Sequence, residues 1–495
     1  MAIAKVLGTE TEYGIQVAGN PEANPTLASS VLVNAYAAEV ARRVGWDFED
    51  ESPGRDARGF TVEGAMPPEV ETHLANTVLT NGARFYVDHA HPEYSTPECA
   101  TPLEAVAHDR AGELVLVRAM AAARRATGAG EEIVVYKNNS DGKGNSYGAH
   151  ENYLVDRAVP FVRLAREVTA HLVTRQVYTG AGKVGCEADR GPRAAFEITQ
   201  RADFFEEEIG LETTLKRPIV NTRDEPHCDP AKYRRLHVIT GDANLAEVAT
   251  FLKLGVTALV LLLVEDEVLS QRELVLARPV QAMRAVSHDL TLAQPLELVT
   301  GETITAIGLQ WELYDAARKH AEERGLAELG PESVGELLLE RWEAVLSGLE
   351  TDPASLKHQL DWVAKRELID AYCARHGCDL DDHRVAVLDL QYHDMRPARS
   401  LFARLDMEQI VPAGEVEAAT TSAPRGTRAY FRGECLKRFA PSIVAANWDS
   451  IVFDVGEDSL RRVPMMEPLR GSASHVDTLF EGCGSAAELL RRLGA

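Results

Sequence analysis

The chain is poor in basic residues for its size. Only 52 lysines and arginines stand against 76 aspartates and glutamates among 495 residues, which gives a formal net charge of −24. Nucleic acids and anionic membrane surfaces attract clustered basic side chains. The charge balance therefore argues against either as a general partner, and any anionic ligand needs a local basic pocket.

Long hydrophobic runs are also scarce. The most apolar stretch, Leu254 to Val264, predicts no membrane span because a bilayer needs about 20 apolar residues. The opening sequence MAIAKVLGTETEYG lacks a basic segment followed by an apolar run, so we expect no signal peptide. These features predict a cytoplasmic protein.

Cysteine is sparse: seven residues at scattered positions form no disulfide framework, and we expect reduced thiols. Cys373 and Cys378 lie near His376 and His383. Their spacing matches no standard zinc-ligand pattern, and the end of a predicted helix explains it.

Length and patterning predict an α+β protein. A chain of 495 residues exceeds the usual size of one domain, and its 45% hydrophobic and 26% charged residues are ordinary for a folded protein. Strand patterns over 5–17, 132–137 and 149–155 precede a largely helical region over 305–376, which favours a sheet open on one face. A Pro- and Gly-containing segment over 407–426 reads as a linker or long surface loop, and we predict domains over 1–420 and 421–495.

Two helix starts are marked by capping residues. Thr101, Pro102 and Glu104 form a capping box with proline at the first helical position, and the helix is expected to reach about Thr127. Asn244 and Glu247 predict a second capped helix, apolar almost all round. By contrast, residues 45–80 show no sustained period and predict a long loop, which is usually functional or disordered.

The segment NGARFYVDHAHPEYSTPE, residues 81–98, concentrates polar chemistry on one predicted strand. Alternate side chains of a strand share a face, so Arg84, Tyr86 and Asp88 point one way while Phe85 and Val87 point into the core. A guanidinium, a phenol and a carboxylate on one face suit a site for anions and divalent metal. An exposed sheet edge is the alternative.

Further candidate ligands lie elsewhere in the chain. Glu10 and Glu12 in GTETEYG are two residues apart, so on a strand both carboxylates face one side and can converge on a metal. His150 and His237 are additional candidates, although a single histidine often serves a structural role.

Arginines gather at predicted strand ends. Arg201 and Arg223 stand out in this acidic chain, and guanidinium groups hold phosphate or carboxylate through two parallel hydrogen bonds. Ordinary pairing with Asp203, Asp224 and Glu225 is the alternative.

Taken together, six motifs resemble the PafA/Dop family of Pup ligases and depupylases. They are GTETEYG, NGARFYVDHAHPEYSTPE, KNNSDGKGNSYGAHENYL, VNTRDEPH, RRLHVITGDAN and NWDSIVFD. The resemblance implies a glutamine synthetase-like large domain with a curved, mainly antiparallel sheet backed by helices, plus a small C-terminal domain. It also implies a cradle for ATP, or ADP with phosphate, and Mg²⁺.

Two features favour the depupylase branch: the acidic insertion ESPGRDARGF within residues 45–80, and the short form DHAHPEY. That branch hydrolyses the isopeptide bond between the C-terminal glutamate of Pup and a substrate lysine, and deamidates a C-terminal glutamine of Pup. The implied partners are Pup and pupylated proteins, and the inserted loop is expected over the entrance to the site. A Pup–protein ligase, a small-molecule glutamate ligase and a silent Pup-binding adaptor are the alternatives.

The resemblance also assigns roles to individual residues. Asp88 falls on the catalytic aspartate. Metal ligation falls on Glu10, Tyr86, Glu93, His150 and His237, with Glu12 a weaker candidate. Nucleotide contacts fall on Arg84, Thr96 and Trp448. Arg201 and Arg223 are placed to bind nucleotide phosphates or the carboxylates of Pup's terminal residue, and both roles stay open.

Overall fold

The fold was taken from a computed structural model of the whole chain. It describes residues 1–40, 44–49, 51–62, 75–128, 132–185 and 194–494. Part of the predicted 45–80 loop, residues 50 and 63–74, therefore lies outside the described residues.

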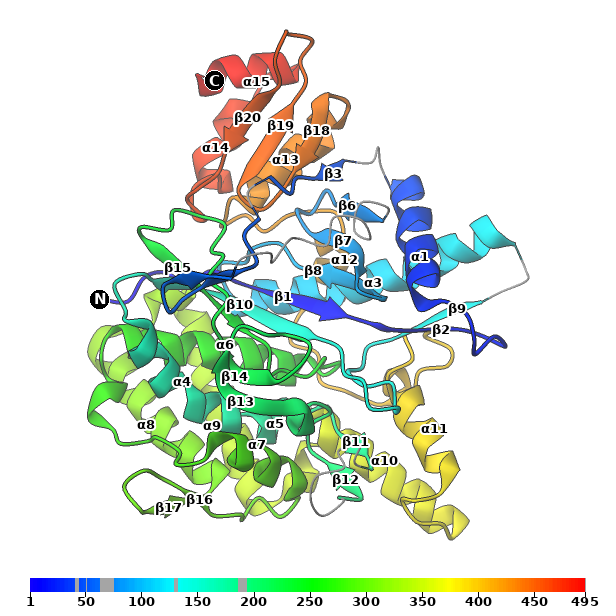
Figure 1. The fold of residues 1–495 in the computed structure, drawn as a ribbon, viewed down its shortest axis with the longest axis vertical. Helices are drawn as coiled ribbons and strands as arrows, with labels where there is room; N and C mark the ends of the chain where they lie inside the picture. Colours follow the sequence, from blue (N-terminus) through cyan, green and yellow to red (C-terminus); the bar gives the residue numbers. More distant parts are fainter. Residues whose placement is uncertain (41–43, 50, 63–74, 129–131, 186–193, 495) are drawn as a thin grey trace.

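A six-stranded sheet organises the molecule. Its strands follow the order β15-β10-β1-β8-β7-β6, and every neighbouring pair is antiparallel. Their bounds are β1 Leu7–Glu12, β6 Asn76–Val78, β7 Arg84–Asp88, β8 His91–Ser95, β10 Ala149–Asp156 and β15 Tyr233–Val238. This mainly antiparallel sheet with helices on one side confirms the predicted α+β class (Figure 1).

Shorter strands form small sheets around it. They are β2 Gly14–Val17 with β9 Ile133–Tyr136, β4 Arg55–Asp56 with β5 Phe60–Thr61, β11 Lys183–Val184 with β12 Phe196–Glu197, β13 Phe205–Gly210 with β14 Arg217–Asn221, and β16 Leu296–Glu297 with β17 Thr303–Ile304. A four-stranded sheet near the C-terminus joins β3 Gly45–Trp46 to β18 Ile443–Ala446, β19 Ser450–Phe453 and β20 Arg461–Pro464.

Helices make up most of the rest of the described chain. The α-helices are α1 Pro25–Val40, α3 Pro102–Thr127, α4 Phe161–Thr174, α5 Gln176–Thr179, α6 Glu247–Glu265, α7 Pro279–His288, α8 Ala306–Arg324, α9 Glu332–Thr351, α10 Asp361–His376, α11 His383–Tyr392, α12 Ala413–Ala419, α13 Ala429–Phe439, α14 Ala473–Phe480 and α15 Ala486–Leu493. A short 3₁₀ turn, η1, covers Ala202–Phe204.

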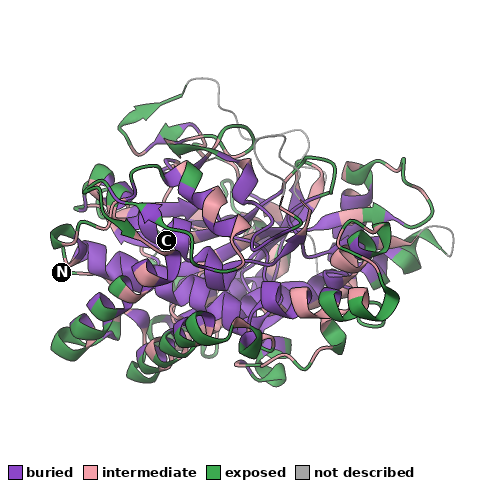
Figure 2. Ribbon diagram, turned by 90° about the horizontal axis from the view of Figure 1, so that it is seen from below, coloured by how far each residue is buried: buried purple, intermediate pink, exposed green. Residues whose placement is uncertain are grey.

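Two long helices cover the inner face of the sheet. α3 packs against β1 and α6 packs against β10, and the two helices also touch each other. The capping box at the start of α3 is confirmed: the Glu104 amide donates to Thr101 Oγ1 at 3.1 Å, and the Glu104 carboxylate accepts from the Ala100 amide at 2.9 Å. Figure 2 shows the buried residues concentrated in this central layer.

Helix α6 has the length and hydropathy of a membrane span, and all of it is buried. The helix is 19 residues long, longer than the apolar run Leu254–Val264 from which no membrane span was expected. Burial, rather than length, marks it as a core helix. Its predicted cap is also wrong: Asn244 does not cap the helix. The carboxylate of Asp361 accepts from the amides of Leu245 and Ala246 instead, at 3.2–3.3 Å.

Three other expectations need correction. The strand predicted over 5–17 divides into β1 and β2, which belong to different sheets. The described residues of the region 45–80 form four short strands, of which β6 is the edge strand of the main sheet. The expected linker over 407–426 contains α12, which packs on α3. In the first case tertiary pairing divided a strand pattern between two sheets, and in the other two it gave structure to a segment without a clear local period.

The C-terminal sheet is fastened to the main sheet by a buried ion cluster. Arg428 Nε lies 2.7 Å from Glu98 Oε1, and Arg432 of α13 contacts the other carboxylate oxygen. Both arginine side chains are almost fully buried. Burial acts to raise the pKa of Glu98, but Arg432 and Arg428 outweigh it and lower that pKa to about 2. The boundary at residue 420 stays a prediction.

This cluster predicts a pH-dependent stability. Because the folded-state pKa of Glu98 lies below its ordinary value of 4.5, its contribution is present above pH 4.5 and is lost as the pH falls towards 2. Glu98→Gln should lower the free energy of unfolding at pH 7 by about 3 kcal/mol, measured by urea denaturation. The difference from wild type should shrink below pH 4.5. The control Glu417→Gln, which breaks an exposed pair with Arg118, should change stability by less than about 0.5 kcal/mol; equal effects of the two variants would contradict the argument.

Candidate functional site

The outer face of the main sheet carries a row of polar side chains. Strand register places Glu10 opposite both His150 and Ser95, and Glu12 opposite Glu93. Glu93 in turn lies opposite Tyr86. Because neighbours across an antiparallel pair share a face, side chains from four strands meet on one surface. Phe85 and Val87 are buried on the other face, as predicted.

One end of this row is a group of Glu10, His150 and His237, whose potential ligand atoms all lie within 4.8 Å of one another. Asn152 Nδ2 donates to Glu10 Oε1 at 2.8 Å, and its Oδ1 lies 3.0 Å from His237 Nδ1. His237 is buried, and its Nε2 has no hydrogen-bond partner among the described residues. Arg235 adds a positive charge 3.8 Å from Glu10.

The other end is a group of Glu12, Asp88 and Glu93, again within 4.8 Å of one another. Tyr86 Oη donates to Glu93 Oε1 at 2.6 Å. Asp88 ends its strand and its side chain is 24% exposed, so it is the member of the group most open to a ligand.

Gly148 shapes the position of Glu12. Its amide donates to Glu12 Oε1 at 2.8 Å, while a Cβ at this residue would lie 2.4 Å from His150 Nε2 and 2.7 Å from the Glu12 oxygen. Only glycine therefore allows the backbone to approach both side chains. Glu12 is held on its other oxygen by His91 Nδ1 at 3.1 Å.

The carboxylates differ in their electrostatic state. Burial raises the pKa of Glu93 well above its usual value, and Asp88, Glu10 and Glu12 raise it further. For Glu12, burial is outweighed by the hydrogen bond and charge of His91, so its pKa falls to about 2. Burial is likewise outweighed at Glu10, where His150, His237 and Arg235 lower the pKa. Four acidic side chains therefore lie close together, and one of them is forced towards its neutral form. A bound cation would reduce the repulsion among them.

The Arg84 guanidinium packs against the aromatic rings of Trp46 and Tyr86. Its guanidinium carbon is 4.0 Å from the ring centre of Trp46 and 3.8 Å from that of Tyr86. Trp46 also contacts Trp448 edge to face at 5.1 Å. The stack holds Arg84 rigid next to the carboxylates and connects it with the C-terminal sheet.

Two adjoining cavities open over this face. The larger, of about 450 Å³, is lined by nine of the residues proposed from the sequence: Glu10, Arg84, Tyr86, Asp88, Glu93, His150, Arg223, His237 and Trp448. Four residues of the described 44–62 segment also line it: Phe48, Glu51, Pro53 and Val62. This part of the inserted loop therefore lies against the cavity.

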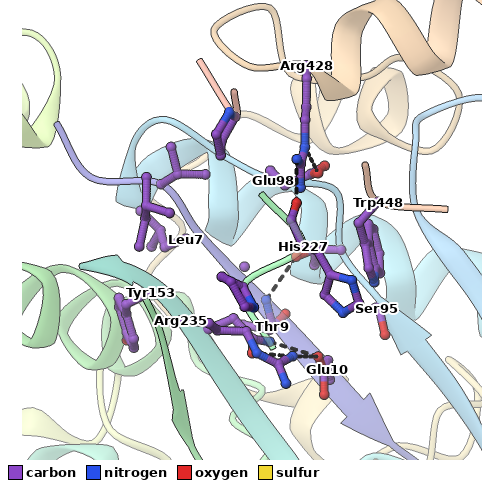
Figure 3. Close-up of a pocket in the computed structure, with 17 residues that line it drawn as sticks. Leu7, Thr9, Glu10, Ser95, Glu98, Tyr153, His227, Arg235, Arg428 and Trp448 are labelled. Carbon is purple, nitrogen blue, oxygen red and sulfur yellow. Dashed lines mark hydrogen bonds and ion pairs between the residues drawn. The ribbon is translucent and has the colours of Figure 1, made fainter. Parts of the chain in front are cut away.

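The smaller cavity, of about 90 Å³, is lined by Thr96 and more apolar groups and shares Glu10, Arg235, His227 and Trp448 with the larger one. Figure 3 shows Trp448 and His227 on one side of it and Arg235 reaching Glu10 below. Thr96 Oγ1 accepts from the Thr9 amide at 2.9 Å, so its hydroxyl oxygen also fixes the two strands.

Two proposed residues line neither cavity: Glu12, which lies beside Asp88 and Glu93, and Arg201. Arg201 lies further from the acidic residues than Glu12 does, behind the segment that follows β15. It is 1% exposed and donates to the carbonyl of Ile239 and, at 3.2 Å, to Ser146 Oγ. Burial, reinforced by Arg217, lowers its pKa to about 10. Arg223, by contrast, lines the larger cavity.

Sequence reasoning missed several residues of the site. Asn152 and His91 each lie two positions from a proposed residue on the same strand, so strand alternation was a signal for both. Trp46 and Arg428 had no local signal, because they come from segments distant in sequence: Trp46 stacks on Arg84, and Arg428 lines the smaller cavity.

The pKa of Glu93 is raised whereas that of Glu12 is lowered, so substitutions of the two residues should have opposite effects on stability. Glu93→Gln replaces a carboxyl group that burial and its acidic neighbours force towards the neutral form with a group that is always neutral. It should therefore raise the free energy of unfolding in EDTA by roughly 1–2 kcal/mol. Glu12→Gln removes a favourably held carboxylate and should lower it. Both variants should weaken Mn²⁺ binding, measured by calorimetry. Destabilisation by Glu93→Gln in EDTA would show that the carboxylates do not repel one another as described.

Comparison with known proteins identifies the family of this chain. A family model described as Pup-ligase protein matches residues 5–452. The chain is 52% identical to a depupylase from Acidothermus cellulolyticus and 48% identical to a Pup deamidase/depupylase from Mycobacterium tuberculosis, each match covering 99% of both proteins. A solved complex of Pup with its ligase PafA matches 97% of this chain and 92% of that one, with a TM-score of 0.81 and 31% identity. The chain therefore belongs to the Pup-ligase protein family.

Proposed function

We propose that this protein is a depupylase and Pup deamidase. It hydrolyses the isopeptide bond between the C-terminal glutamate of Pup and a substrate lysine, and it converts a C-terminal glutamine of Pup to glutamate. The observation that carries the proposal is full-length identity of 47–52% to proteins named depupylase or Pup deamidase/depupylase. Proteins named Pup–protein ligase are 37–40% identical.

The donor set of the larger cavity fits a magnesium nucleotide. Carboxylate oxygens are the ligands that Mg²⁺ prefers, and Glu10 and Glu93 supply them from the cavity lining. His150 and His237 lie beside Glu10, and Glu12 lies next to Glu93. A structure of the ligase PafA in complex with ADP, 36% identical over 82% of this chain with a TM-score of 0.74, supports nucleotide binding. When bound, the magnesium nucleotide polarises an oxygen and neutralises developing negative charge.

The protein's own groups have distinct roles in this proposal. Arg84, Thr96 and Trp448 contact the nucleotide. Arg223 binds its phosphates or a carboxylate of Pup's terminal residue, because it lines the cavity that holds Asp88. The buried Arg201 acts from the wall of the site, within electrostatic range of Glu12.

Asp88 is the proposed catalytic residue. It is the exposed member of the acidic group at the end of β7, and its carboxylate lies 3.0 Å from His89 Nδ1. Two routes are open to it: direct attack on the side-chain carbonyl of Pup's last residue, or positioning of the water or phosphate that attacks. Because amide hydrolysis is downhill, nucleotide is needed as a cofactor and is not consumed at each turnover.

The first test is a mass measurement. Pup with a C-terminal glutamine, incubated with enzyme, ATP and Mg²⁺, should gain about 1 Da as its amide becomes an acid, by amide hydrolysis. Asp88→Asn should reduce this rate at least about 10³-fold, since the reacting group is removed. The matched control Asp315→Asn, on an exposed position of α8, should leave the rate unchanged. Full activity of Asp88→Asn would remove Asp88 from the mechanism.

A second test separates hydrolase from ligase. The protein should form no conjugate when it is incubated with ATP, Mg²⁺, Pup ending in glutamate and a protein with accessible lysines. It should instead release Pup from a purified conjugate, followed by gel electrophoresis. Conjugate formation without release would favour the Pup–protein ligase.

Two further proposals accompany this function. The small sheet near the C-terminus belongs to a domain over 421–495, supported by its attachment through α13 and Glu98. The cytoplasm is the proposed location, supported by the unpaired state of the six cysteines in the described part of the chain.

A further inference from the structure

A third group of potential metal ligands lies apart from the two cavities described above. It consists of Glu197 on β12, Asp203 in η1 and His288 at the end of α7. Figure 1 shows β12 and α7 at the opposite end of the molecule from the sheet β18–β20. None of the three residues lines either cavity of the proposed active site.

Glu197 is the unusual member of this group. Its side chain is 0% exposed, and neither carboxylate oxygen has a hydrogen-bond partner among the described residues. The nearest cationic atoms are His288 Nε2, 3.7 Å from Oε2, and Lys183 Nζ, 3.7 Å from Oε1. A carboxylate removed from water without hydrogen bonds is costly to the fold, so a closer cationic partner is expected.

The separations of the donor atoms suit one metal ion. Metal–ligand bonds of about 2.0–2.2 Å at tetrahedral angles put neighbouring donor atoms about 3.3–3.6 Å apart. His288 Nε2 lies 3.1 Å from Asp203 Oδ1 and 3.7 Å from Glu197 Oε2, and all three donor atoms lie within 4.8 Å of one another. Small side-chain shifts therefore bring all three into bonding distance.

The chemistry of the donor atoms limits which metal ion would bind. One imidazole nitrogen with two carboxylates suits Zn²⁺ better than Mg²⁺, which prefers oxygen ligands and water. Two carboxylates also balance the charge of a divalent ion, which leaves Lys183 beside the second oxygen of Glu197 as an outer contact.

We propose that Glu197, Asp203 and His288 form a structural binding site for a divalent transition metal of the Zn²⁺ type, separate from the magnesium nucleotide site. The ion joins α7 to the segment that follows β12. Arg284 of α7 already donates to the carbonyls of Asp203 and Phe205 at 3.4 and 3.1 Å. Because Arg201 lies two residues before Asp203, the ion also fixes the segment that carries this arginine.

The alternative is a protonated His288 that neutralises both carboxylates without a metal. Zinc titration by calorimetry, on nucleotide-free protein treated with a chelator and then freed of it, separates the two. To remove binding at the proposed active site, the background carries Glu10→Gln and Glu93→Gln. We expect one remaining Zn²⁺ per chain.

Glu197→Gln or His288→Gln in that background should weaken this binding at least about 100-fold, because even loss of a group that only supports a ligand costs 10–100-fold. The control His320→Gln removes a buried histidine that lies 3.6 Å from a single carboxylate, Asp266, and should retain the ion. No zinc bound in the background protein, or binding unchanged by both ligand variants, would overturn the proposal.

A measurement on the unaltered protein guards against misfolded variants. Crystals of the wild-type protein grown with Zn²⁺ should show an anomalous scattering peak between Glu197, Asp203 and His288. Zinc peaks confined to the outer face of the main sheet would overturn the site and leave the proposed depupylase function untouched.

Discussion

The site depends on the register of the antiparallel strands. Glu12 lies opposite Glu93, and Glu93 lies opposite Tyr86, so a shift by one residue in either pair would turn an acid towards the core. That register is fixed from the other face, where Phe85 and Tyr94 are opposite each other and fully buried. The packing of the core thus decides which polar groups meet outside it.

The strand register also concentrates acidic side chains on the outer face of the main sheet, at a cost to the stability of the fold. Glu93 is held near-neutral by burial and by its acidic neighbours, whereas Glu12 and Glu10 are kept ionised by histidine and arginine contacts. His237 keeps one ring nitrogen without a partner inside the described protein. Crowded acids and a buried nitrogen without a partner are unfavourable for folding, and such features are expected where a ligand completes the structure. They support the outer face of the sheet as the candidate binding site, independently of any relative.

Segments distant in sequence complete the site by packing on it. Trp46, which leads into the inserted loop, pairs with the C-terminal strand β18 and stacks on Arg84. The buried contacts of Glu98 with Arg428 and Arg432 hold the C-terminal sheet in place beside Trp448. This side of the larger cavity is therefore built by segments far apart in the chain, and its integrity depends on a few buried ion pairs and aromatic contacts.

The sequence by itself determined the chemistry of the strands. Alternation placed Arg84, Tyr86 and Asp88 on one face, and the family motifs supplied the α+β fold and the Pup-directed function. Local periodicity failed where structure came from partners distant in sequence: β6 and α12 lie in segments read as a loop and a linker, and Asp361, not Asn244, accepts from the amides just before α6. Only the tertiary structure brought Asn152 and Trp46 to the site, buried Arg201 away from both cavities and grouped Glu197 with His288. Contacts between residues far apart in the chain are set by packing, which local sequence patterns do not encode.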